Sequence, residues 1–187
     1  MNRTKLIGGI ALVLLSALGG LVISAQDSSA SKYEVRVPGG LAFSEFKGYE
    51  AWQTISLSRN DKFVAVILGN PKMIEAYKSG IPGNGKPFPD GAKMAKVHWN
   101  PKQSALFPTA TVPGSLANVD LMVKDSKRFA ASGGWGYAVF DYDNTSDTFT
   151  PGTKAGTPPQ GNDATCGFAC HSGAKARDFV FTEYGKR

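Results

Sequence analysis

The run Cys166-Gly167-Phe168-Ala169-Cys170-His171 holds both cysteines of this 187-residue chain and one of its two histidines. Two thiols followed at once by an imidazole are typical of covalent haem attachment, in which the thiols bond to the haem and the histidine becomes an axial ligand of the iron. Three residues separate the cysteines instead of the usual two, so we expect a bulge or tightened turn between the two bonds. The sequence thus predicts one haem c, covalently attached through Cys166 and Cys170 and ligated by His171.

Two other interpretations of this motif stay open. A disulfide would suit an exported protein, but cysteines four residues apart on a helix direct their Cβ atoms poorly for one, and so short a loop gains little stability. A zinc site would need a fourth ligand, and the only other histidine, His98, lies far away in an apolar run.

The N-terminal residues follow the order of a secretory signal, with Arg3 and Lys5 before the uncharged run 6–23 and the small pair Ser24-Ala25. We expect residues 1–25 to be a cleaved signal peptide and the protein to be periplasmic. The apolar run is also long enough for an uncleaved N-terminal membrane anchor. Removal of residues 1–25 reduces the formal net charge from +6 to +4, which is too mild to indicate nucleic acid binding.

The chain beyond the signal has the length of one domain and can bury about 70% of its unfolded surface. It begins with the small polar residues 26–31, which are typical of a flexible segment. We therefore expect residues 26–44 to form a leader and residues 45–187 to form one haem domain.

Apolar and polar residues alternate in several short segments, as in half-buried strands. The helix signal is equally specific, with Asn70 as N-cap and Pro71 at the first helical position. The sequence predicts strands at 51–58, 62–69, 93–99, 118–123 and 135–141, a helix at 71–78, a loop at 79–91, a turn at 142–144, and a helix opened by the cysteine motif. This pattern indicates an α+β fold, mainly an antiparallel sheet with a few short helices and a C-terminal haem-attachment helix.

Three motifs in this order resemble the cytochrome P-460 family, which is related to the cytochrome c′-beta proteins. They are Pro89-Asp90-Gly91-Ala92-Lys93-Met94-Ala95-Lys96, the run 123–129 followed by Gly134-Trp135-Gly136-Tyr137, and the terminal cysteine motif followed by Phe179-Val180-Phe181-Thr182. The resemblance covers roughly residues 45–187. It implies a mostly antiparallel homodimer with one five-coordinate c-type haem whose distal side is open. Family enzymes oxidise hydroxylamine, whereas the c′-beta relatives bind nitric oxide.

The resemblance also assigns roles to two residues outside the cysteine motif. Lys96 falls where family enzymes carry a lysine bonded to the porphyrin, and Asp120 falls where relatives carry a distal carboxylate that takes a proton from a nitrogen substrate. Lys93 is the alternative to Lys96, but strand alternation places these two side chains on opposite faces. Met94 should then share the inward face with Lys96, and Ala95 the outer face with Lys93.

Three functions remain open from the sequence. Hydroxylamine-oxidising relatives tend to have a distal arginine in the second strand, and residues 62–70 contain none, which favours a site that only binds a small neutral gas. Lys96 and Asp120 together favour catalysis, with a periplasmic electron acceptor as partner. A six-coordinate electron-transfer haem would need a second ligand; the candidates by residue type are Met73, Met94, Met122 and His98.

Overall fold

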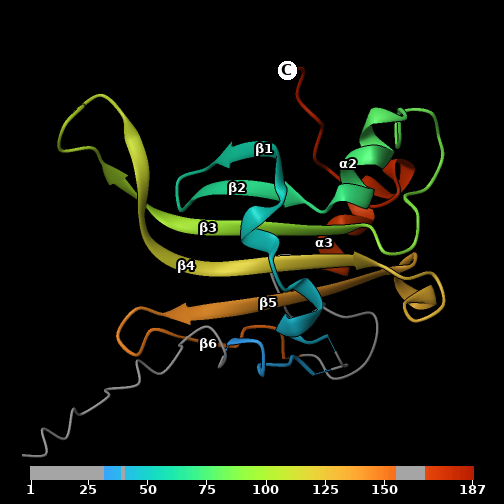
Figure 1. Cartoon of the computed structure of the whole chain (residues 1–187), viewed down its shortest axis with the longest axis horizontal. Helices are drawn as coiled ribbons and strands as arrows, with labels where there is room; N and C mark the ends of the chain where they lie inside the picture. The colour runs from blue at the N-terminus through green and yellow to red at the C-terminus, as the bar shows by residue number, and fades with distance from the viewer. Residues whose placement is uncertain (1–31, 39–40, 155–166) are drawn as a thin grey trace, which may run out of the picture.

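The computed structural model describes residues 32–38, 41–154 and 167–187. Its main element is one antiparallel sheet in which each strand pairs with the next along the chain, in the order β1-β2-β3-β4-β5-β6 (Figure 1). The strands are β1 (Gln53–Arg59), β2 (Val64–Gly69), β3 (Lys93–Gln103), β4 (Thr111–Lys124), β5 (Trp135–Asp143) and β6 (Thr148–Pro151). The helices are α2 (Pro71–Lys78) and α3 (Phe168–His171), with short 3-10 turns η1 (Phe43–Phe46), η2 (Tyr49–Ala51), η3 (Ala130–Ser132) and η4 (Ser172–Arg177). The predicted α+β class is confirmed.

Helix α2 begins and ends at the predicted residues, because its start is specified locally. The Asn70 side chain accepts a hydrogen bond from the backbone N–H of Met73 at 3.0 Å, and Pro71 occupies the first turn. The same Asn70 oxygen accepts the N–H of Lys93, while its amide nitrogen donates to the Gly91 carbonyl. One side chain therefore fixes both the helix start and the point where β3 begins.

The β3–β4 hairpin is much longer than the sequence predicts. It projects beyond the rest of the sheet on the left of Figure 1, and Pro101 pairs with Pro113 after register shifts around Trp99. Two prolines and Gly114 argue against strand in the sequence, but they lie where the ladder is already irregular. The predicted limits of residues 99 and 118 are therefore wrong for this hairpin.

The predicted turn at 142–144 is also displaced. Strand β5 continues through Tyr142 and Asp143, which pair with Phe149 and Thr148 of β6, a strand that the sequence did not predict. The Tyr142 and Phe149 rings lie 4.9 Å apart, and this cross-strand aromatic contact favours the longer pairing.

The two faces of the sheet carry separate cores. One face packs against the N-terminal segment, which crosses it in Figure 1. Leu41 and Phe43 are fully buried there, and the Phe43 N–H bonds the Val35 carbonyl at 2.9 Å. These residues fall within the segment 26–44 predicted as a leader, so the folded unit includes residues before 45, because their apolar side chains cover this face.

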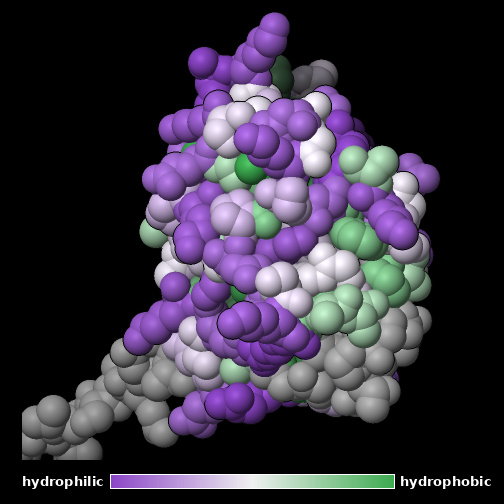
Figure 2. All heavy atoms as spheres, turned by 90° about the vertical axis from the view of Figure 1, so that its right-hand side faces the viewer, coloured by the Kyte–Doolittle hydropathy of each residue, from purple (hydrophilic) through white to green (hydrophobic). Residues whose placement is uncertain are grey.

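The other face packs against α2 and the C-terminal segment and carries the second core. Figure 2 looks onto the end of the molecule that holds these elements and shows mainly hydrophilic residues with smaller hydrophobic areas between them. Among the described residues, no helix has the length and apolar character needed to cross a membrane. The predicted signal peptide, or anchor, at residues 1–25 lies outside the described residues.

Candidate functional site

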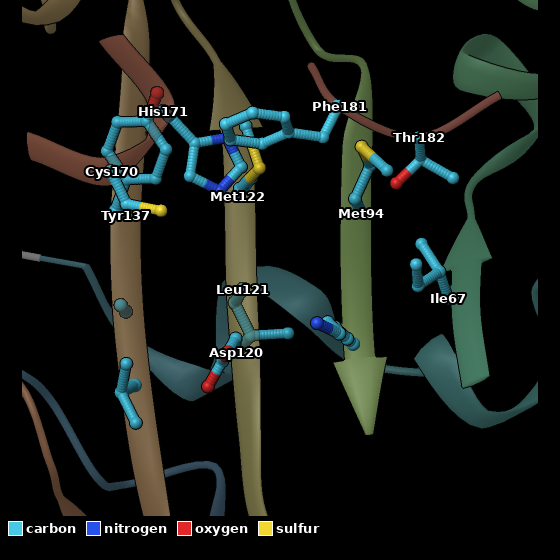
Figure 3. A pocket seen from close by; sticks show the side chains of 13 residues that line it. Ile67, Met94, Asp120, Leu121, Met122, Tyr137, Cys170, His171, Phe181 and Thr182 are labelled. Carbon is cyan, nitrogen blue, oxygen red and sulfur yellow. The ribbon is translucent and has the colours of Figure 1, made fainter. Parts of the chain in front are cut away.

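A cavity of about 250 Å³ lies on the face that carries the second core, between the sheet and the C-terminal segment (Figure 3). Strands β2 to β5 supply one wall, and α3 with the residues after η4 supplies the other. The lining residues are Ile67, Met94, Lys96, Asp120, Leu121, Met122, Tyr137, Ala138, Val139, Cys170, His171, Phe181 and Thr182. The structure thus brings together all the described residues that the sequence analysis assigns to the site, namely Lys96, Asp120, Cys170 and His171.

His171 ends helix α3 and is held from behind by the backbone. Its Nδ1 lies 2.6 Å from the Phe179 carbonyl oxygen. A carbonyl only accepts, so Nδ1 carries the proton and Nε2 keeps its lone pair for a metal. The ring lies between Tyr137 and Phe181, with centroid distances of 5.1 and 5.3 Å.

Burial keeps this imidazole neutral. It lowers the pKa of His171, the Phe179 hydrogen bond raises it, and the Lys96 charge lowers it again, with a net decrease. A neutral imidazole with one nitrogen anchored and the other available is the form that ligates iron.

Cys170 lines the same cavity, and its side chain is exposed beside His171. The predicted helix does open at this motif, since α3 begins at Phe168. Cys166 lies outside the described residues, so the predicted bulge between the two cysteines is not described. Within the described part of the chain, no three His, Cys, Asp or Glu residues gather in a way that could hold a metal by themselves.

The two lysines of the Asp-Gly motif lie on opposite faces of β3, as predicted. Lys96 lines the cavity together with Met94. Lys93 instead donates to the Glu45 carbonyl on the other face, where its ammonium lies 5.5 Å from the centre of the Phe46 ring. Ala95 belongs to the core on the side of Lys93. Only Lys96 of this pair can meet a group bound in the cavity.

Asp120 pairs directly with Lys96 across β3 and β4. Its side chain is 16% exposed, and Oδ2 lies 3.6 Å from Nδ1 of His98. His98 does not line the cavity; its Nδ1 contacts Asn118 Oδ1 at 2.7 Å. An acid therefore faces the cavity with a lysine beside it and a histidine behind it.

His98 gives this region a measurable pH dependence. Burial, with help from the Lys96 charge, lowers its pKa from 6.5 to about 4, although the Asn118 hydrogen bond raises it. Between these values the unfolded chain binds a proton that the folded chain does not, so stability is complete above about pH 6.5 and decreases as the pH falls toward about 4. Wild type should lose about 2 kcal/mol more than His98→Gln over this window, as measured by denaturant unfolding at several pH values. Equal losses in the two proteins would contradict this assignment.

Tyr137 lines the cavity, although the sequence analysis assigns it no role in the site. Its hydroxyl is fully buried and has no hydrogen-bond partner among the described residues. Burial raises the pKa of the phenol, so it stays protonated and able to donate. Buried hydroxyls rarely lack a partner, and the ring that carries this one lies 5.1 Å from the His171 ring, centre to centre.

The four candidate second ligands separate into two groups. Met94 and Met122 face each other across β3 and β4 and line the cavity. Met73 is fully buried in α2, and His98 is bonded to Asn118; neither lines the cavity. On β2 the cavity position is Ile67, so this strand contributes an apolar wall.

These features fit a haem. The wall formed by Ile67, Met94, Met122 and Val139 is apolar enough for a porphyrin, His171 presents one free nitrogen, and Cys170 lies beside it. Lys96 and Asp120 add a polar region to the cavity. In Figure 3, Asp120 lies at the opposite end of the cavity from His171. Fold and site together define a haem cytochrome built on an antiparallel sheet.

A family model agrees with this class. The Cytochrome P460 family matches residues 46–182, so the chain belongs to that family and its cofactor is haem. No curated protein matches the chain.

Proposed function

We propose that this protein is an exported mono-haem c-type cytochrome whose open distal site binds small nitrogen species such as nitric oxide or hydroxylamine. The observation that carries the proposal is the cavity itself, because His171, with Nδ1 anchored to a carbonyl, shares it with the apolar side chains of Ile67 and Val139. A haem iron there would supply a vacant coordination position and a redox centre.

Residues at different positions around the cavity would have different tasks. Cys166 and Cys170 would attach the cofactor, and His171 would hold it from one side. The apolar side chains of Ile67 and Val139 would exclude water from the opposite side and favour a small neutral ligand. The protein would be a homodimer, as the family resemblance implies, and would lie in the periplasm, as the predicted signal peptide implies.

Oxidation of hydroxylamine is a second candidate, and one observation favours it. Asp120 and Lys96 line the same cavity as His171, so a carboxylate could take a proton at Oδ2 from a bound nitrogen compound, while a bond from the Lys96 amine would fix and tune the macrocycle. A periplasmic electron acceptor would then complete the reaction. In the simple binding protein neither residue has a chemical task.

Attachment and turnover can be tested on one preparation of holoprotein made with haem-maturation machinery. Under denaturing conditions the intact mass should exceed that of the polypeptide by one haem. Replacing Cys166 or Cys170 should leave one bond, and replacing both should give haem that acidic solvent extracts. The purified protein is then mixed with hydroxylamine and an electron acceptor, and also with nitric oxide.

Nitric oxide binding without hydroxylamine turnover would assign the binding function, and turnover that is lost in Asp120→Asn would assign the enzyme. A mass equal to the bare polypeptide, or failure to bind either compound, would contradict the proposal.

A further inference from the structure

We propose that Lys124 and Asp178 are positioning residues for the iron ligand: their buried ion pair fixes the Phe179 carbonyl that holds His171. This inference rests on the proposed role of His171. Neither residue lines the cavity, so they would act through the backbone rather than by touching the cofactor.

The backbone at this point adopts an unusual conformation. Asp178 and Phe179, directly after η4, have φ values of +51° and +64°. Aspartate tolerates the left-handed region, but a bulky aromatic residue rarely enters it. Such conformations persist only where the surroundings hold them firmly. The Phe179 carbonyl accepts the hydrogen bond from His171 Nδ1. The orientation of this carbonyl thus depends on contacts made by neighbouring residues.

Asp178 supplies those contacts through each of its polar groups. Its carboxylate oxygens lie 2.7 and 2.9 Å from the Lys124 ammonium, and Oδ2 also accepts the Phe88 N–H at 2.8 Å. Its carbonyl accepts the Trp135 indole N–H at 2.8 Å. The residue next to the His171 acceptor is therefore tied to three separate parts of the fold.

Lys124, the partner of this carboxylate, is buried in the core. It ends β4, its side chain is only 7% exposed, and its ammonium also donates to the Gly133 carbonyl at 3.0 Å. The same ammonium lies 5.2 Å from the Trp135 ring centre. A buried lysine is rare unless it is paired, and the Asp178 carboxylate is its ion-pair partner within the described chain.

The consequence for the site is chemical as well as steric. A hydrogen bond from Nδ1 to a fixed carbonyl sets the rotation of the imidazole and makes Nε2 a stronger donor to the iron. If the ion pair is broken, the left-handed turn relaxes and the bond to His171 weakens. The iron then receives less electron density from the ligand.

The test uses ferrous holoprotein of wild type, Lys124→Met and Lys124→Arg. Resonance Raman spectroscopy reads the iron–histidine stretching band, and redox titration reads the potential. We expect Lys124→Met to lower the band frequency and raise the potential, because a weaker donor stabilises the ferric state less. Lys124→Arg retains the cation and should restore both values toward wild type.

Matched controls separate this effect from general destabilisation. Asp178→Asn is isosteric and can still accept the Phe88 N–H, so it serves where Lys124→Met does not fold, and it should shift both readouts in the same direction. Glu45→Gln breaks the Arg128–Glu45 ion pair, whose nitrogen and oxygen lie 2.8 Å apart away from the cavity, and should shift neither. If Lys124→Met or Asp178→Asn has a lower melting temperature but keeps the wild-type band and potential, this inference is wrong. The proposed function is not affected by that result. Absence of any iron–histidine band in wild type would overturn the proposed function together with this inference.

Discussion

Replacing Lys96 by leucine is expected to move the ferrous Soret band toward that of an ordinary c-type haem and to reduce any hydroxylamine oxidation, while attachment through the cysteines stays intact. The reason is position: Lys96 is the lysine of its strand that lines the cavity beside His171. In wild type, peptide mapping should join the peptide that contains Cys166 and Cys170 to one that contains Lys96.

Lys93→Leu is the matched control for that experiment. It removes a lysine from the same strand, but one whose ammonium contacts the Glu45 carbonyl on the opposite face. We expect a loss of about 1 kcal/mol of stability from the missing hydrogen bond and no change in the spectrum. An ordinary wild-type spectrum without a joined peptide would assign the chain to the gas-binding, uncrosslinked branch of its family.

Replacing Gly133 by alanine is expected to cost more stability than the same substitution at a glycine with open space around it. A Cβ at Gly133 would lie 2.1 Å from Cε2 of the Phe179 ring, at a φ of +68°. The ring belongs to the residue that holds His171, so it cannot move without disturbing the site. Strain at positive φ and overpacking together should cost about 2–5 kcal/mol in thermal or denaturant unfolding.

Gly48→Ala measures the backbone strain at positive φ without a steric contact. The difference between the two substitutions is therefore the steric part of the effect. Gly48 has a comparable φ of +83°, but a Cβ there meets nothing within 4 Å. Both substitutions restrict the unfolded chain equally, so Gly48→Ala should cost about 1–2 kcal/mol and leave the haem spectrum unchanged. If Gly133→Ala costs no more than Gly48→Ala, the contact with Phe179 does not constrain the fold as the structure indicates.

The parts of the site that the sequence predicts are those encoded locally. Alternation along β3 separates Lys96 from Lys93, because side chains three residues apart on a strand point to opposite faces. The Asn70-Pro71 pair specifies the start of α2, because a cap and a first-turn proline act within a few residues. The position of His171 directly after Cys170 predicts the iron ligand for the same reason.

The parts that the sequence does not predict depend on contacts between distant residues. Lys124 and Asp178 are 54 residues apart. The residues around each of them in the sequence do not indicate that the two form an ion pair. Tyr137 looks like any aromatic residue of a strand until the fold shows its hydroxyl buried with no hydrogen-bond partner in the described part of the chain. The long β3–β4 hairpin contains prolines that oppose strand formation locally, and only the pairing of the two strands overrides them.

Carbon monoxide binding to the reduced protein tests the central claim, an open haem site with His171 as its protein ligand, most directly. The ferrous holoprotein should show a high-spin spectrum that changes on addition of carbon monoxide to that of a six-coordinate low-spin complex. A low-spin ferrous spectrum that carbon monoxide leaves unchanged would contradict the claim. If Met94→Ala or Met122→Ala then allowed carbon monoxide to bind, that methionine would be the second ligand and the protein an electron-transfer cytochrome.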